Sequence, residues 1–489
     1  MSVTLEEVCE HGIQPIPEHR RSKLPESCTY FSAVLLSVWD NILGPQVYHV
    51  WNGPTAHRLQ PGIIQYVSSH TLNGEIVRAD YGEHPGERIS AKLFVFAEKD
   101  ACVTAFIFKG HLKSGSCLFS LCLVMTIDQL TSYLPLHDLC EAKMKCCITQ
   151  LIRMQKQGIP IQQFSSVIEK FVQSVASIAL APLTDVKLQS TVFHGQACEI
   201  FEVEFVKRCI TSHLQTCCCT VVVGEAIEPL NMLISTLALF LSPAERLRSR
   251  YAVNETDTGD LEYESNLFLQ GLLVKRGESY HKKIPSSEVI RTKLPSTLIN
   301  VTALTVEQTN LTHKHHAMRD DFLALEYNLM MEPGRRREEA LQSADISKTS
   351  FSTFPAVPDS SNFYKNLFRE TYDHSKLVQD FLREVYELVP SCGVREAYIS
   401  QFARLLQRKA LALIKYVGAE DNTRFDLPLG PGISREIIKK LKKALSLEME
   451  GDFKIILATA EKLRPGMFLH LLGDPAAQCK KVQEELEVL

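Results

Sequence analysis

Cysteine and histidine are the residues whose types and spacing come nearest to a chemical site in this chain. The sequence holds 15 cysteines, among them the run Cys217-Cys218-Cys219, and His213 stands shortly before that run. A zinc site needs two ligand pairs at matching spacing, and no second pair follows here. We therefore expect the cysteines to be small buried core residues. A cysteine- or zinc-dependent enzyme remains an alternative.

Phosphate-binding loops are the second kind of site that the sequence allows us to judge. The stretch VVVGEAIEP (221–229) predicts a strand, a glycine and a helix, which is the order of elements at a nucleotide site. It matches neither GxxxxGK[ST] nor GxGxxG, so no glycine-rich loop is expected to wrap a phosphate. We therefore do not expect this chain to be a GTPase. HKHH (313–316) could hold a metal ion and GRRREE (334–339) a phosphate, but both are more typical of solvated surface.

Composition excludes several classes of protein. The net charge is −4, from 53 basic and 57 acidic residues, which gives no electrostatic reason to bind nucleic acid. The first residues contain no apolar run typical of a secretion signal. The longest apolar stretch, 229–241, is too short to cross a bilayer, which takes roughly 20 residues. We expect a cytoplasmic protein of several domains.

The two tryptophans of the chain, Trp39 and Trp51, flank a short bend at 40–45. The apolar run before the bend has the length of a buried strand, and QVYHVW (46–51) alternates like a second strand. Because Gly44-Pro45 breaks the chain between them, the pair predicts a hairpin.

The residues up to 160 predict an α+β layer. The expected elements are, in order, strands at 32–39 and 46–51, a helix at 61–73, strands at 92–98, 102–109 and 117–127, and a helix at 128–157. Lys99-Asp100 is expected to form a two-residue turn, Asp128 to cap the last helix, and Pro135 to break it. A variable segment, 1–28, precedes this antiparallel five-stranded sheet, which spans 29–160 with helices on both sides.

The middle of the chain predicts a second layered domain. A helical linker is expected at 161–196, followed by an α/β domain at 197–360 that includes a variable stretch at 276–360. A strand ending at Gly224, a helix from about Pro229 and a strand at 266–274 favour a largely parallel sheet. Ser242, Pro243 and Glu245 have the types and spacing of a helix capping box.

The last part of the chain, 361–489, is predicted to be helical. Its helices are expected to stop at Pro390, Gly418 and Pro465, and Asp452 is expected to cap the last of them. Two of these helices carry basic residues on one face. They are Arg404, Arg408 and Lys415 on the first helix, and Lys439, Lys440, Lys442 and Lys443 on the second. Such faces could attract anionic lipid or an acidic partner, although a simply solvated face is the commoner case.

Several colinear motifs resemble one known family. The matching stretches are WDNILGPQVYHVW (39–51), HTLNGEIVR (70–78), TSYLPLH (131–137), SHLQTCCCTVVVG (212–224), LFLSPAERLRSR (239–250), YESNLFLQGLL (263–273), LQRKALALIKY (406–416) and EGDFKIILATAEKLRPG (450–466). Together they resemble the longin–DENN proteins, in which a longin domain precedes a DENN domain. The chain looks like a diverged relative, because it departs from the family in its first 30 residues, in 276–360 and after Pro465.

The resemblance implies a regulator of Rab- and Arf-type small GTPases in autophagy and endosome–lysosome traffic. Its implied partners are a second longin–DENN protein, the Smith–Magenis-region candidate protein, and a WD40-repeat protein. It implies guanine-nucleotide exchange or GTPase activation without cofactor or metal, with the catalytic arginine on the partner. Arg78 and Arg88 are the nearest candidates here, and no motif assigns them that role. The implied location is the cytoplasm with recruitment to lysosomes, endosomes and autophagosomes as a peripheral membrane protein, and a nuclear pool besides.

The first hairpin is the expected partner interface. The candidate residues are Trp39, Asn41, Gly44, Pro45 and Trp51. They belong to a sheet whose edge, in related modules, pairs with another chain, because an edge strand carries unpaired backbone groups. On this hypothesis a change at Trp51 weakens assembly more than folding. The alternative is an assembly or lysosome-recruitment adaptor that has no direct effect on a GTPase.

Overall fold

The structure is a computed structural model. It describes residues 16–73, 89–112, 115–194, 200–254, 261–309, 315, 319, 367–370, 373–389, 393–420, 435–447 and 449–472. Within these residues the chain forms two units that divide between Ala179 and Leu180. That division lies at the end of helix α4 (Ser165–Leu180), so the greater part of the predicted helical linker belongs to the first unit.

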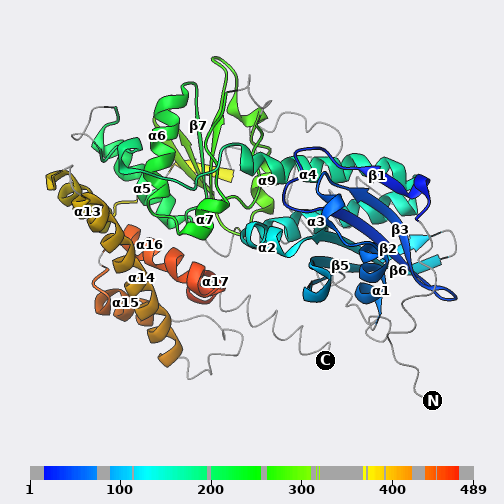
Figure 1. Ribbon diagram of the computed structural model, residues 1–489. Helices are drawn as coiled ribbons and strands as arrows, with labels where there is room; N and C mark the ends of the chain where they lie inside the picture. Colours follow the sequence, from blue (N-terminus) through cyan, green and yellow to red (C-terminus); the bar gives the residue numbers. More distant parts are fainter. Residues whose placement is uncertain are drawn as a thin grey trace, which may run out of the picture. The chain divides into compact units, whose positions relative to one another are not determined.

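The first unit contains a six-stranded sheet (Figure 1). Its strands are β1 (Arg21–Lys23), β2 (Ala33–Asp40), β3 (Gly44–Asn52), β4 (Ile89–Phe96), β5 (Ala101–Leu112) and β6 (Gly115–Met125), in the order β1-β3-β2-β6-β5-β4. The expected hairpin is confirmed as β2 and β3, which pair antiparallel. The expected count of five strands is wrong, because β1 lies inside the segment predicted as variable and pairs parallel to the end of β3.

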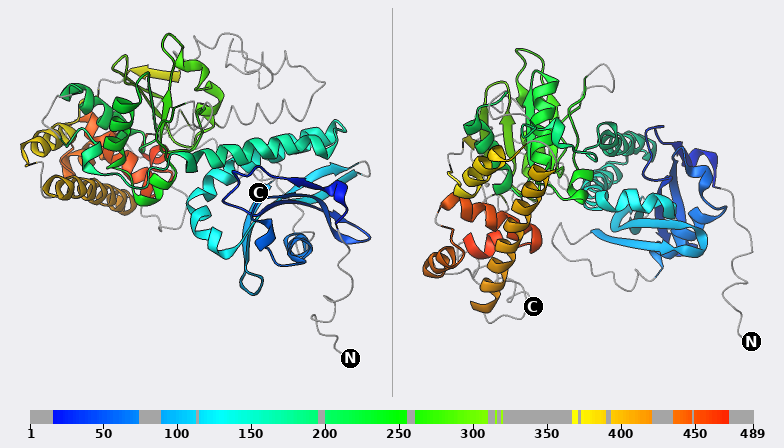
Figure 2. Two further views of the ribbon diagram at one scale, coloured as in Figure 1. Left: turned by 45° about the horizontal axis from the view of Figure 1, so that its top comes forward. Right: turned by 60° about the vertical axis from the view of Figure 1, so that its left-hand side comes forward.

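Helices cover both faces of this sheet (Figure 2). Helix α1 (Ile63–Leu72) places Ile63 and Val67 in one apolar cluster with Leu35, Val103 and Val124 of the strands. On the opposite face, α3 (His137–Lys156) packs against β5, and α4 contacts Trp51 of β3. Because neighbouring strand residues point to opposite faces, Trp51 faces the α4 side while Val50 faces α1.

Two local predictions for this unit need correction. Helix α2 (Ile127–Tyr133) is capped by Thr126, in a reciprocal box with Gln129, so Asp128 lies inside the helix. The loop between β4 and β5 has four residues, because Phe96 pairs with Ala101 and the residues between form a 3-10 turn ending at Asp100. The break at Pro135 is confirmed by a 3-10 turn, Leu134–Leu136, between α2 and α3.

The second unit contains a five-stranded sheet of mixed direction. Its strands are β7 (Thr220–Gly224), β8 (Leu269–Leu273), β9 (Thr297–Asn300), β10 (Thr305–Thr309) and β11 (Phe368–Glu370), in the order β11-β10-β9-β7-β8. β7 runs parallel to both β8 and β9, as expected for an α/β unit, whereas β10 and β11 join antiparallel.

Helices pack on both faces of the second sheet. The helices of the second unit are α5 (Val203–Gln215), α6 (Ile227–Ala238), α7 (Pro243–Leu247), α9 (Ser286–Arg291), α13 (Lys376–Glu387), α14 (Val394–Glu420), α15 (Arg435–Ala444), α16 (Glu450–Leu463) and α17 (Met467–Leu472). Val222 and Ile299 share one core with α5, α6 and the C-terminal helices, while Val221 and Leu298 pack against α9. The capping box of Ser242 and Glu245 is confirmed at the start of α7.

Helix α16 is buried and caps two of its neighbours. Oδ1 of Asp452 accepts hydrogen bonds from the Ser375 hydroxyl (2.6 Å) and from the backbone N–H of Leu377 (3.1 Å), at the start of α13. Glu461 accepts from the backbone N–H groups of Gly466 (2.8 Å) and Phe468 (2.7 Å), at the start of α17. Asp452 was expected to cap its own helix. That prediction is wrong, because α16 begins two residues earlier and Asp452 points to α13 instead.

The close contact between α16 and the start of α13 explains why residue 451 is a glycine. A Cβ atom added to Gly451 would run into the carbonyl oxygen of His374, directly before the cap residue of α13. Gly418 was predicted to end a helix. That prediction is wrong, because α14 continues past Gly418 to Glu420. The stop after α16 at Pro465 agrees with the prediction, because α16 ends at Leu463.

Removal of the Asp452 carboxylate is expected to destabilise the second unit. In Asp452→Ala the N–H of Leu377 loses its buried acceptor, at a cost of about 2 kcal/mol. Differential scanning calorimetry of the full chain measures this as a lower melting temperature. Glu450→Ala is the matched control, because Glu450 is a mostly exposed acid on the same turn, paired with Lys442 at the surface. Equal melting temperatures for the two variants would contradict the role of Asp452.

Candidate functional site

The turn between β2 and β3 is fixed by its own hydrogen bonds. Oδ1 of Asp40 accepts from the backbone N–H groups of Ile42 (2.8 Å) and Leu43 (2.9 Å), and these bonds lower the pKa of Asp40. Gly44 follows with a φ of 75°, a left-handed conformation that favours glycine. The turn therefore has a defined shape without support from another element.

This turn presents two large apolar side chains to solvent. Ile42 is 92% exposed and Leu43 is 70% exposed. Apolar side chains that cluster at an exposed turn are a feature of protein docking surfaces. We call Ile42 and Leu43 the hairpin tip.

Four of the five predicted interface residues lie beside the hairpin tip. Asn41 is exposed, while Trp39, Gly44 and Pro45 are partly exposed, and Trp39 pairs with Pro45 across the hairpin. The hairpin tip itself, Ile42 and Leu43, was not selected from the sequence. The sequence does show these two apolar residues between Asn41 and Gly44, which are both typical of turns. Whether their side chains are exposed could not be judged without the fold.

Trp51 lies at the other end of β3 and is completely buried. Its Nε1–H donates to the Ser165 hydroxyl (2.8 Å), and its ring meets Phe164 edge-on with centroids 5.9 Å apart. Helix α4 and the turn before it cover this tryptophan, so its side chain forms no part of the surface of this chain. The structure therefore corrects the expectation that a change at Trp51 acts on assembly more than on folding.

The two edges of the first sheet differ. At one edge β1 pairs only with the last residues of β3, and beyond them the Arg20 guanidinium donates to the carbonyl of Val47 (3.0 Å). At the other edge is β4, which has a strand partner on one side only among the described residues. Its Leu93 and Val95 are 44% and 55% exposed. β4 thus offers an edge of eight residues with apolar side chains.

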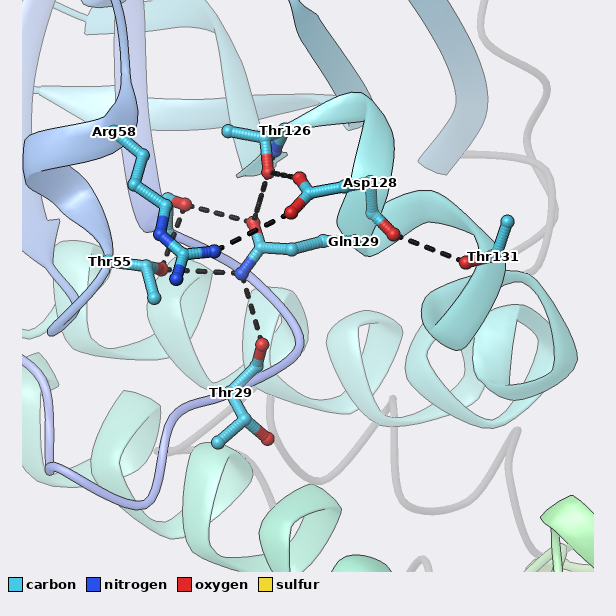
Figure 3. A network of polar contacts seen from close by, with 8 residues as sticks. Thr29, Thr55, Arg58, Thr126, Asp128, Gln129 and Thr131 are labelled. Atoms are coloured by element: carbon cyan, nitrogen blue, oxygen red, sulfur yellow. Dashed lines mark hydrogen bonds and ion pairs between the residues drawn. The ribbon is translucent and has the colours of Figure 1, made fainter.

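A polar network fixes the loops that lead into and out of this sheet (Figure 3). Oε1 of the buried Gln129 accepts from the backbone N–H of Thr126 (3.1 Å) and from the Ser32 hydroxyl (2.9 Å). Its Nε2 donates to the carbonyl of Thr29 (3.0 Å) and to the Thr55 hydroxyl (3.3 Å). The amide is fully satisfied, so this network is structural.

The surface side of the same network carries charge. Arg58 and Asp128 form an ion pair of 3.5 Å there, and both side chains are more than half exposed (Figure 3). An exposed pair of this kind contributes little to stability, on the order of 0–1 kcal/mol.

The cysteine run of the second unit is buried, and burial keeps its thiols protonated at neutral pH. Burial raises the pKa of Cys218 to about 11 and that of Cys219 to about 12, so neither is a thiolate at neutral pH. Burial lowers the pKa of His213 to about 3, and its Nδ1 lies 2.8 Å from the Thr220 hydroxyl. The described residues contain no group of three or more His, Cys, Asp or Glu side chains that could hold a metal ion. In the described part of the chain, the cysteine run and His213 are therefore part of the packed core.

The remaining sequence candidates are mostly outside the described residues. Arg78, Arg88 and the stretch GRRREE (334–339) all fall there, as does most of HKHH. His315 of that motif is buried, with its Nε2 2.8 Å from the carbonyl oxygen of Thr292. In the described part of the chain, no helix combines the length and the apolar composition needed to span a membrane.

Comparison with known proteins identifies the family. A model of the C9orf72-like protein family matches residues 66–315, from α1 into the second unit. The human protein named guanine nucleotide exchange factor C9orf72 is 32% identical over 477 residues, which cover 91% of this chain and 92% of that protein. The chain belongs to the C9orf72-like family. The mouse and rat homologues are each 32% identical over 471 residues, with the same coverage.

Membership of the C9orf72-like family agrees with the predicted resemblance to a diverged relative. The hairpin at 39–51 precedes the range that the family model matches. Its role as an interface therefore remains a prediction, based on the exposure of the hairpin tip.

Replacement of Trp51 is expected to destabilise the first unit. Trp51→Phe removes the hydrogen bond to Ser165 and leaves a small cavity, which together cost about 2 kcal/mol. Thermal unfolding followed by circular dichroism measures the loss. Trp39→Phe is the matched control, and its partly exposed ring predicts a smaller change. If both variants unfold at the wild-type temperature, Trp51 is not the anchor that its contacts indicate.

Proposed function

We propose that this protein is the regulatory subunit of a longin–DENN heterocomplex that acts on a small GTPase of the Rab or Arf type. The observation that carries the proposal is the match to relatives named guanine nucleotide exchange factor, at 32% identity over 91% of the chain. The missing phosphate-binding motifs are consistent with it, because a regulator of a GTPase does not need to bind the nucleotide itself.

Such a regulator can act through binding surfaces alone. An exchange factor displaces nucleotide by changing the shape of the GTPase, which needs a docking face and no reactive side chain. GTPase activation would instead need an arginine in the transition state, worth about 10³–10⁵ in rate, and we place that residue on the partner chain. Exchange is favoured here because it is the activity that the relatives' name states.

We assign the contact with the second longin–DENN protein to the first unit. The hairpin tip supports this assignment, because Ile42 and Leu43 expose apolar surface on a turn that is already ordered. Preordered surfaces lose little conformational entropy on binding. The proposed complex also contains the WD40-repeat protein and works in autophagy and endosome–lysosome traffic, in the cytoplasm and on those organelles.

A second candidate function is an assembly or lysosome-recruitment adaptor with no direct effect on a GTPase. The observation that favours it is that both exposed features of the first unit, the hairpin tip and the edge strand β4, are docking features. Both features expose large apolar side chains.

Nucleotide exchange distinguishes the two candidates. The chain alone and the chain with its longin–DENN partner are added to a panel of Rab and Arf proteins loaded with a fluorescent guanosine diphosphate. We expect the complex to accelerate nucleotide release from at least one of them by tenfold or more, on the order of 1.4 kcal/mol of barrier. Hydrolysis of GTP is measured in parallel. If neither rate changes in either preparation, the regulatory proposal is wrong and the adaptor remains.

The position of the interface is tested by changes at the hairpin tip. Ile42→Ser/Leu43→Ser removes exposed apolar surface only, so we expect an unchanged melting temperature. Co-purification with the longin–DENN partner should fall tenfold or more, about 1.4 kcal/mol of binding free energy. Leu93→Lys/Val95→Lys makes the comparison at the edge strand β4, because lysine discourages edge pairing. Loss of the partner with the β4 variant alone would move the interface from the hairpin to that edge.

A further inference from the structure

The exposed side of α14 carries a basic stripe. Arg404, Arg408, Leu411 and Lys415 follow one another at intervals of three or four residues, so they lie along one side of the helix. All four are exposed, and Leu411 is 55% exposed. The opposite side of α14 holds Ile399, Phe402, Leu406 and Leu413 in the core of the second unit.

The acids of α14 lie at its two ends. Between Glu396 and Glu420 the sequence of α14 contains no Asp or Glu. Within the described residues, none of the ion pairs involves Arg404, Arg408 or Lys415. The neighbouring helix α13 differs, because its exposed Arg383 is paired with Asp380 at 3.0 Å. The stripe is therefore a local excess of positive charge in a chain whose net charge is −4.

Helix α15, which follows α14 in the chain, carries further exposed lysines. The Lys409 ammonium donates to the carbonyl of Leu445 (2.6 Å), which joins α14 to the end of α15; Figure 1 labels both helices. Lys442 is occupied by Glu450 and the ring of Phe453. Lys439, Lys440 and Lys443 are exposed instead, and the exposed acid on α15 is Glu436. None of the ion pairs among the described residues involves these three lysines. We call these three lysines and the α14 stripe, which lie on two successive helices, the basic face.

We propose that the basic face binds the surface of an anionic lipid bilayer. Each Lys or Arg near such a surface contributes about 1 kcal/mol, and a group of four to eight on amphipathic helices is typical of binding to acidic lipids. Leu411, placed between Arg408 and Lys415, can enter the interfacial layer where the charges meet the headgroups.

A bilayer fits the basic face better than an acidic protein does. The charges lie on the exposed outer sides of two helices, and a bilayer can meet such a surface without a complementary groove. Most of them are lysines, whose flexible point charges suit a diffuse anionic surface rather than bidentate recognition of single carboxylates. The inference goes beyond the proposed function and does not depend on it, because no GTPase or partner chain enters the argument.

Vesicle flotation of the full-length chain tests the proposal. The vesicles contain phosphatidylcholine alone or phosphatidylcholine with an equal amount of phosphatidylserine. We expect binding to the anionic vesicles only, and weaker binding at high salt because salt screens exposed charges. Arg404→Gln/Arg408→Gln/Lys415→Gln should weaken binding about a hundredfold, at about fivefold for each charge removed. Leu411→Gln should weaken it as well.

Two control variants show whether binding depends on the position and the sign of these charges. Lys187→Gln/Lys282→Gln/Lys293→Gln removes the same charge from exposed positions elsewhere in the second unit and should leave binding unchanged. Arg404→Lys/Arg408→Lys keeps the charge and should also bind as the wild type does. All variants are first shown to melt at the wild-type temperature.

Two results would overturn the proposal. The first is a triple α14 variant that binds anionic vesicles as well as the control triple variant does. The second is a wild-type chain that does not bind anionic vesicles, and its binding to soluble polyglutamate would then identify the basic face as a site for an acidic protein.

Discussion

Buried backbone N–H groups at helix starts must find an acceptor, and at two helices of the second unit α16 supplies one. α16 lies in the core and directs Asp452 to the start of α13 and Glu461 to the start of α17. Each carboxylate accepts from backbone N–H groups at a helix start, which have no acceptor inside that helix. These bonds fix where α13 and α17 begin, and α13 in turn packs against α14, whose outer side carries the basic face.

The fold was predictable from the sequence where local signals decide it. The hairpin of β2 and β3, helix α1 and the capping box at α7 all depend on residues a few positions apart. β1 was missed because three residues carry no periodicity and pair only through β3. Asp452 was assigned to the wrong helix for a similar reason. A residue at a helix start usually caps that helix, and only the fold shows that α13 begins beside it.

The candidate site shows the same limit of sequence analysis. Both tryptophans flank the turn as predicted, yet Trp39 is partly exposed and Trp51 is buried. Which of two similar residues is covered depends on α4, more than one hundred residues further along the chain. The exposure of Ile42 and Leu43 likewise follows from the lack of any described element over the turn, which no local pattern encodes.

The buried cysteine run has a practical consequence. Cys217 and Cys218 both have left-handed backbone conformations, with φ of 55° and 66°, in a segment that is closed to solvent. A thiol that is both protonated and inaccessible does not react with an alkylating reagent, whereas the same thiol in an opened chain does. The rate at which an alkylating reagent labels these positions therefore reports how often the second unit opens. The measurement needs no cysteine introduced by mutation.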